Sequence, residues 1–321
     1  MRAYIIRRLL AIIPTILLAS MIVFLIIRLI PGDIIDQMLK EHEYRTDVSR
    51  ELTRETIKKS LGLDIPIHIQ YARWLGDIFL HGSLGESLWS HLPVTQEILQ
   101  RWPVTFELGL LAILVAVTIA LPVGIYSAIR QDTIGDYIGR SLAILCVAIP
   151  VFWSATMVMV FPSLWWGWSP EVMLIPFTED PLGNLQMFIV PAVVLGAAMA
   201  GVTMRMTRTM MLEVLRQDYI RTAWSKGLRE RVVVIRHALK NALIPVVTIF
   251  GLQLPVMIGG AVIIEQIFVL PGIGRLMLEA INARDYPIVS GVMVFVATAV
   301  LLINLIVDLS YAFLDPRIHY R

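Results

Sequence analysis

Residues 204–241 read MRMTRTMMLEVLRQDYIRTAWSKGLRERVVVIRHALKN, and residues 242–264 continue with ALIPVVTIFGLQLPVMIGGAVII. The first stretch, called the basic segment below, holds nine Lys or Arg residues and three acidic ones, whereas the second holds no charged residue. A helix of about 20 apolar residues is long enough to cross the hydrocarbon core of a bilayer. The two stretches therefore predict a chain that leaves a membrane, makes a basic excursion into water and then returns.

The rest of the chain repeats this alternation. Of its 321 residues, 57% are hydrophobic and 16% are charged, against about 25% charged in an ordinary soluble domain. The charges are clustered and leave six long uncharged runs, at Leu9–Ile27, Leu108–Ile129, Ser141–Pro170, Leu182–Met204, Ala242–Ile264 and Tyr286–Val307. We therefore expect an all-α polytopic membrane protein with six transmembrane helices. The first run is longer than the apolar core of a signal peptide, which favours a retained anchor.

These runs divide the chain into three expected parts. Residues 1–30 form the N-terminal tail and first transmembrane helix, residues 31–104 form a small extracytoplasmic domain, and residues 105–321 form a five-helix core. The core helices are expected at about 105–129, 138–162, 186–207, 243–265 and 286–313, with a cytoplasmic loop at 208–242. The third run is too long for one simple crossing, and its Trp165, Trp166 and Trp168 are typical of an aromatic belt at a membrane surface.

The distribution of basic residues predicts the orientation. With the N-terminus inside, the inner side receives Arg130, Arg140 and the whole basic segment. The outer loop between the third and fourth runs has no Lys or Arg at all. Because short cytoplasmic loops are enriched in Lys and Arg, we expect both termini in the cytoplasm.

The basic segment is longer than this bias requires. Its apolar residues Val214, Leu215, Tyr219, Ala223 and Trp224 fall near helical spacing, which predicts a helix with an apolar face. A glycine, at position 227, can end this helix before a second one starts over residues 232–239. Two short helices whose apolar face has no partner in the chain indicate docking of a separate subunit.

The order of residues in and after this segment resembles one family closely. Residues 218–228 (DYIRTAWSKGL) and 236–245 (RHALKNALIP) are similar to the cytoplasmic coupling loop of bacterial ATP-binding-cassette importer permeases, in their dipeptide, oligopeptide and nickel branch. Further matches in the right order extend the resemblance over nearly the whole chain, and they lie at Arg7–Asp33, Leu61–Leu75, Gly82–Leu88, Pro93–Leu108, Leu270–Leu276, Ala283–Gly291 and Asn304–Tyr320.

The resemblance implies a function and a set of partners. It implies the type I importer permease fold and the first permease of a pair, in a bacterial or archaeal cell membrane. Its partners would be a second homologous permease, two ATPase subunits that hold ATP and Mg, and an extracytoplasmic binding protein; this chain itself would hold no cofactor. The cargo implied most often is a short peptide, with nickel complexes or oligosaccharides as alternatives. The residues implied to couple to the ATPases are Asp218, Tyr219, Arg221, Thr222, Ala223, Lys226, Gly227, Leu228, His237, Asn241 and Pro245.

Polar and small residues inside the spans have two interpretations. Gly259 and Gly260 can simply let helices approach closely, or they can line a path together with Ser154, Gln253 and Asn304. Ionisable groups within a membrane indicate function by default, yet at the ends of spans snorkelling or local pairing explains them. We expect a structural role for Arg28 and Asp308. The role of Glu265 stays open between the two.

The residues LPGIG at 270–274 combine a Pro-Gly turn with apolar flanks. A plain loop is possible, but the flanks favour a segment packed back against the helices. In the family that the chain resembles, this region helps to form the exterior gate, so Pro271 and Gly272 join the candidate gate residues.

Several other functions are not favoured. The chain has no GxxxxGK[ST] phosphate loop, no zinc-type histidine spacing, one cysteine, Cys146, and no nucleophile–base arrangement, so we expect no catalytic or metal-binding residues. The basic segment is attached to membrane on both sides and has few aromatic residues, which argues against nucleic acid. The main rivals are an ion-coupled secondary carrier, which would show buried acidic or histidine chains, an intramembrane enzyme, and a membrane scaffold without transport.

Overall fold

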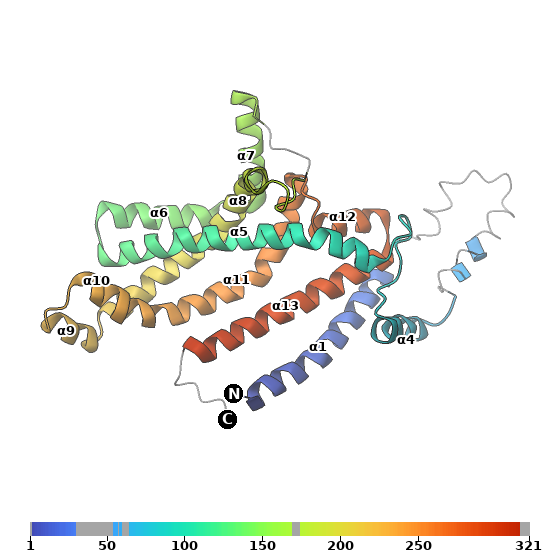
Figure 1. Ribbon diagram of the computed structural model, residues 1–321, viewed down its shortest axis with the longest axis horizontal. Helices are drawn as coiled ribbons and strands as arrows, with labels where there is room; N and C mark the ends of the chain where they lie inside the picture. Colours follow the sequence, from blue (N-terminus) through green and yellow to red (C-terminus); the bar gives the residue numbers. More distant parts are fainter. Residues whose placement is uncertain (1, 30–53, 57, 60–63, 169–173, 315–321) are drawn as a thin grey trace. The chain divides into compact units, whose positions relative to one another are not determined.

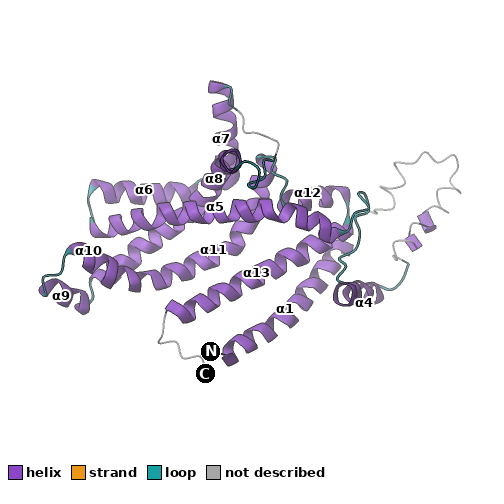
Figure 2. Ribbon diagram, in the orientation of Figure 1, coloured by secondary structure: helices purple, strands orange, loops and turns teal. Residues whose placement is uncertain are grey.

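The computed structural model describes residues 2–29, 54–56, 58–59, 64–168 and 174–314 (Figure 1). Every element of at least three residues in these ranges is helical (Figure 2). In chain order the elements are α1 Arg2–Leu29, α4 Ile67–Gly76, η1 Asp77–His81, α5 Val94–Ile129, α6 Ile134–Ala148, α7 Val151–Trp166, α8 Pro181–Leu215, α9 Asp218–Ser225, α10 Glu230–Val232, η2 Val233–Leu239, α11 Lys240–Ile267, α12 Ile273–Ala283 and α13 Tyr286–Leu314.

Several of these helices are long and apolar enough to cross a membrane. Within the described residues there are four, namely α5, α8, the continuous helix Glu230–Ile267 and the part Tyr286–Val307 of α13. The pair α6 and α7 makes a fifth if the two count as one bent span. The first of the six predicted transmembrane helices corresponds to α1, whose described apolar part, Leu10–Ile26, is shorter. The predicted all-α polytopic membrane protein is confirmed.

The helix expected over 138–162 is two helices in the structure. The axes of α6 and α7 differ by 97° at a break between Ala148 and Val151. Pro150 causes the break, because proline lacks an N–H group and forces the preceding residue into an extended conformation. Ile149 accordingly has φ −83° and ψ 122°.

Two other helices are longer than the uncharged runs predicted. The helix α5 begins at Val94 rather than near 105, because charged residues end an uncharged run but do not end a helix. Arg101 and Glu97 are paired at 3.5 Å, one turn apart, within this extension. The helix α8 begins at Pro181, where the Asp180 side chain accepts hydrogen bonds of 3.1 Å from two backbone N–H groups, as an N-terminal cap does.

The described chain forms two compact units. The larger unit holds residues 102–275 and those after 299, and α8 lies at its centre, packed against α6, α7 and α11. In the apolar part of α8, 67% of the residues are buried, against 17% in the helix Glu230–Ile267. The helices α8 and α5 also approach each other closely, because a Cβ at Gly196 would lie 2.6 Å from the carbonyl oxygen of Ala112 on α5.

The smaller unit combines residues up to Arg101 with Leu276–Ala299. The buried Asp285 accepts a hydrogen bond of 2.6 Å from the hydroxyl of Ser87. The indole N–H of Trp89 donates to the carbonyl of Ala283 at 2.9 Å. These bonds fix the segment before α5 onto the corner between α12 and α13.

Candidate functional site

The first half of the basic segment ends in a well-defined turn. The helix α9, Asp218–Ser225, is followed by Gly227, whose φ is 71°. The N–H of Gly227 donates to the carbonyl of Trp224 at 2.9 Å, and the N–H of Leu228 donates to the carbonyl of Ala223 at 3.4 Å. These two bonds form a Schellman motif, whose left-handed residue is usually glycine. The predicted helix break at Gly227 is therefore confirmed.

The second half of the basic segment leads directly into a helix that is long and apolar enough to cross a membrane. Helix α10, the π-helical turn η2 and α11 follow one another without a gap, as one continuous helix over Glu230–Ile267. The side-chain amide of Asn241 donates to the hydroxyl of Tyr219 at 2.8 Å and to the carbonyl of His237 at 3.3 Å. Asn241 thus joins the start of α9 to the start of α11. Two residues predicted for the same role are brought together.

The apolar face of α9 differs from the predicted one. Ile220 is fully buried and Ala223 nearly so, in a cluster with Met211, Val233 and other residues of the same unit. The prediction placed Tyr219 and Trp224 on a single face with Val214 and Leu215. It was wrong because α8 continues to Leu215 and a turn then changes the helical phase. The buried face of these helices is covered from within the chain.

The outward face of the basic segment carries aromatic and charged side chains. Tyr219, Trp224 and Ile235 are 44%, 45% and 51% exposed. Asp218 and Arg221 form an ion pair at 3.4 Å on the same helix, and both side chains are largely exposed. The helix–turn–helix thus exposes apolar and aromatic side chains together with charged ones.

The remaining residues predicted for this site lie in α9, in the turn after it or at the start of α11. The Thr222 hydroxyl donates to the carbonyl of Asp218 at 3.0 Å. Lys226 is the C-terminal cap of α9 and is exposed. Leu228 packs against the cluster of Ile220, and Pro245 lies within the first two turns of α11.

Glu265 lies in the second candidate site, at the corner between α11 and α12. Its carboxylate is fully buried and accepts hydrogen bonds from the Thr105 hydroxyl at 2.6 Å and from the backbone N–H of Arg275 at 3.0 Å. The Thr105 hydroxyl in turn accepts the N–H of Ile273 at 2.8 Å. Together these two side chains satisfy N–H groups in the first turn of α12, which a helix leaves without intrahelical partners.

The LPGIG segment is built around this carboxylate. A Cβ at Gly272 would collide with the carboxyl group of Glu265, and a Cβ at Gly274 would lie 2.6 Å from the Cα of Val262. Leu270 is buried in the apolar cluster of the same unit, and Pro271 next to it is half-buried. The expectation that this segment packs back against the helices is confirmed.

The other candidate pore residues are not joined into one polar path. The Gln253 amide donates to the hydroxyl of Thr203 on α8 at 3.1 Å, while the Ser154 hydroxyl donates at 3.3 Å to the carbonyl of Pro150, the residue before its own helix. Asn304 is half-buried on α13. Within the described part of the chain no hydrogen bond joins Ser154, Gln253 and Asn304.

The paired glycines of α11 have different surroundings. A Cβ at Gly259 would meet open space, whereas one at Gly260 would lie 3.1 Å from a methyl group of Leu195 on α8. Gly260 thus fits the close-packing interpretation. The side chains of Arg28 and Asp308, for which we expected structural roles, lie outside the described residues.

Sequence reasoning missed two polar contacts. Thr105 carried no signal, because a threonine in an apolar helix has no spacing relation to a glutamate 160 residues away. The second is the buried pair of Asp136 on α6 and Arg208 on α8. Among the described residues no group of three or more His, Cys, Asp or Glu side chains could hold a metal ion.

Comparison with known families covers nearly the whole chain. Residues 120–320 match the family described as "Binding-protein-dependent transport system inner membrane component". Residues 1–109 match the description of the N-terminal part of such membrane components.

Individual relatives match over their full length. A protein of Brucella suis biovar 1, provisionally named a peptide transport system permease protein, is 42% identical, with all of both chains covered. The dipeptide transport system permease protein DppB of Escherichia coli K12 is 37% identical, again with all of both chains covered.

A solved structure supports the fold. The chain of an inward-facing MetNI methionine ABC transporter has a TM-score of 0.55 and 18% identity, and the match covers 68% of this chain and 97% of that one. At this identity the likeness shows the fold alone. From the family match over most of its length and the full-length relatives, the chain belongs to the binding-protein-dependent transport system inner membrane components, as a permease subunit of an ATP-binding-cassette importer.

Proposed function

We propose that the basic segment is the docking site for the ATPase subunits of the importer. The observation that carries this proposal is the outward surface of Tyr219, Trp224 and Ile235 on a helix–turn–helix frame. Exposed aromatic side chains beside charges are typical of interfaces between proteins. The continuous helix Glu230–Ile267 gives a direct mechanical route from this surface into the membrane.

The complete assembly would contain four further proteins. A second permease would supply the other half of the pore, two ATPases would hold ATP and Mg, and a binding protein would deliver cargo from outside. Residues 31–104 would then face the exterior, residues 105–321 would form the core, and both chain termini would lie in the cytoplasm. ATP-driven closure of the ATPases would move the basic segment as a rigid body.

We assign the second candidate site to the pore and its exterior gate. The corner formed by Glu265, Pro271 and Gly272 would hold the gate segment in place, because it anchors the start of α12. Ser154, Gln253, Gly259, Gly260 and Asn304 remain candidates for the pore wall.

The proposed cargo is a short peptide. The support comes from the names of full-length relatives, which include a dipeptide permease of Escherichia coli K12. Nickel complexes and oligosaccharides are the alternatives within the same importer class.

The test is purification of this chain through a tag from cells that express its partners, followed by reconstitution into liposomes. We expect two ATPases and a second permease to co-purify, and ATP-dependent uptake of labelled dipeptides and tripeptides once binding protein is added. Uptake of nickel complexes or oligosaccharides instead of peptides would contradict the proposed peptide cargo and identify one of these as the cargo. Uptake that follows an ion gradient without ATP would overturn the importer assembly.

The docking surface has its own variant. Replacing Trp224 by Ala removes an aromatic side chain that is 45% exposed, so we expect co-purification of the ATPases to fall. Trp166→Ala, at the end of α7, removes a side chain that is 75% exposed and serves as the control. Equal recovery of ATPases with both variants would contradict docking on this surface.

A further inference from the structure

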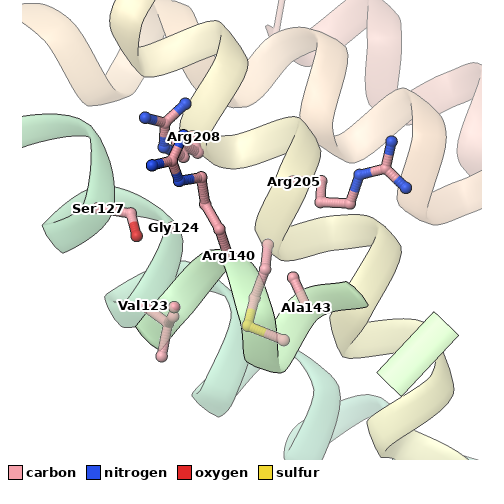
Figure 3. A pocket seen from close by; sticks show the side chains of 9 residues that line it. Val123, Gly124, Ser127, Arg140, Ala143, Arg205 and Arg208 are labelled. Atoms are coloured by element: carbon pink, nitrogen blue, oxygen red, sulfur yellow. The ribbon is translucent and has the colours of Figure 1, made fainter. Parts of the chain in front are cut away.

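An ion pair between a buried carboxylate and a half-buried guanidinium connects α6 to α8. Asp136 is fully buried, and the guanidinium of Arg208 donates two hydrogen bonds of 2.8 Å, one to each carboxylate oxygen. Figure 3 shows Arg208 and Arg140 close together where α6 meets α8, while the guanidinium of Arg205 points away from them. A bidentate pair of this kind fixes orientation as well as distance.

The same carboxylate organises the turn between α5 and α6. It accepts the backbone N–H of Asp132 at 3.0 Å. The guanidinium of Arg140, one turn further along α6, lies 3.6 Å away. Asp136 therefore holds both the turn and the first part of α6 relative to the end of α8.

This turn also meets the basic segment. Arg130 forms an ion pair with Glu230 of α10 at 3.6 Å. Ala128, near the end of α5, is buried in the same apolar cluster as Ile220 of α9 and Val233 of η2. The α5–α6 turn, the end of α8 and the helices α9, α10 and η2 thus form one packed body.

Stability alone is a weak explanation for the buried pair. Replacement of a buried ion pair by well-packed apolar side chains is often neutral or stabilising, because the charges lose their hydration. Next to Arg208 on α8, the buried hydroxyl of Thr207 makes no hydrogen bond within the described residues. What the pair supplies is a single fixed register between α6 and α8.

We propose that Asp136 and Arg208 are positioning residues for coupling, which make α6 move together with α8 when the basic segment moves. Without the pair, the α5–α6 turn is joined to these helices only by apolar packing and by the exposed Arg130–Glu230 ion pair, so α6 can lag behind α8. ATP would then be hydrolysed without matching transport. This inference rests on the proposed docking of ATPases to the basic segment.

The test uses the complete reconstituted importer and measures peptide imported per ATP hydrolysed. We expect Arg208→Gln to keep both ATPases bound, because the outward surface of α9 is unchanged, and to lower import per ATP about tenfold, equivalent to about 1.4 kcal/mol. Arg208→Lys keeps the charge but loses the two-pronged geometry, so we expect an intermediate ratio. The matched control is Arg205→Gln, on the same helix, which removes a guanidinium that forms no ion pair with Asp136 within the described structure.

Each outcome separates coupling from folding. An unchanged import-to-ATP ratio in Arg208→Gln, with or without a lower melting temperature, would overturn the positioning role. An equal fall in Arg205→Gln would overturn it too, by assigning the effect to charge alone. If Arg208→Gln does not assemble, Arg208→Lys decides by the same ratio. Failure of wild-type chain to retain any ATPase would refute the proposed docking instead.

Discussion

At the scale of single residues, we expect the small side chain of Thr105 to contribute strongly to the stability of the fold. Its hydroxyl donates to Glu265 and accepts the N–H of Ile273. Thr105→Val keeps the shape but leaves both partners buried without it, so we expect the free energy of unfolding to fall by about 1–3 kcal/mol. Thermal or denaturant unfolding of the purified importer in detergent measures this loss.

The control for this prediction is another threonine of the same unit. Thr156 donates only to the carbonyl of Phe152 in its own helix, at 2.8 Å. Thr156→Val should change the unfolding free energy by no more than about 0.5 kcal/mol. Equal losses for the two variants would mean that the hydrogen bonds to Glu265 and Ile273 do not account for the loss of unfolding free energy.

Gly227 gives a second residue-scale prediction. Its φ is 71°, and a Cβ would meet nothing within 4 Å, so a side chain is opposed by backbone strain and not by a clash. Gly227→Glu should leave membrane insertion intact but abolish stimulation of the ATPase by loaded binding protein, since the turn between α9 and α10 is distorted. Asparagine tolerates this conformation better than glutamate does, so Gly227→Asn should retain most of the stimulation. An intact response in the Glu variant would count against the prediction.

Residue types with a local signature could be predicted, and contacts between distant residues could not. Gly227 could be assigned as a helix break because a glycine between two apolar helices has few other uses. Glu265 could be noticed only as a charge near the end of a span; its hydrogen bonds depend on Thr105, which a different helix supplies. Asp136 was not noticed at all, because in the sequence a carboxylate in a short polar stretch between two uncharged runs resembles any solvated one.

At the scale of helices, Asp180 should stabilise the start of the central helix. It caps α8 through two backbone N–H groups, so Asp180→Ala should lower the unfolding free energy by about 1 kcal/mol. Glu179→Ala removes the neighbouring exposed carboxylate, which does not cap α8. A melting-temperature comparison of the two variants checks this, and an equal shift would exclude a capping effect.

Charge-free runs predicted where helices lie in the membrane but not how far they extend. The run after residue 107 marks the apolar part of α5, yet that helix starts at Val94 because Arg101 and Glu97 are compatible with it. The break at Pro150 was likewise hidden, because hydropathy is unaffected by a proline among apolar residues. The place where a helix breaks depends on backbone geometry around a proline, which a hydropathy pattern does not record.

At the scale of the whole molecule, the orientation of the chain can be measured by labelling. In a background with Cys146→Ala, a cysteine at Ser225 should react with a membrane-impermeant thiol reagent only from the cytoplasmic side. A cysteine at Ser90 should react only from the outside. Both positions are exposed, and the distribution of basic residues predicts that they lie on opposite sides of the membrane. Labelling of both from one side would refute the predicted topology.

The corner at Glu265 also limits which substitutions this sequence can accumulate during evolution. Any side chain at Gly272 would strike the Glu265 carboxyl group, while a shorter residue at position 265 would leave the N–H of Arg275, in the first turn of α12, without its acceptor. Neither position can change alone without a penalty, so an alternative solution requires two substitutions in the same lineage. A library that varies positions 265 and 272 together should recover combinations that stepwise mutation never reaches.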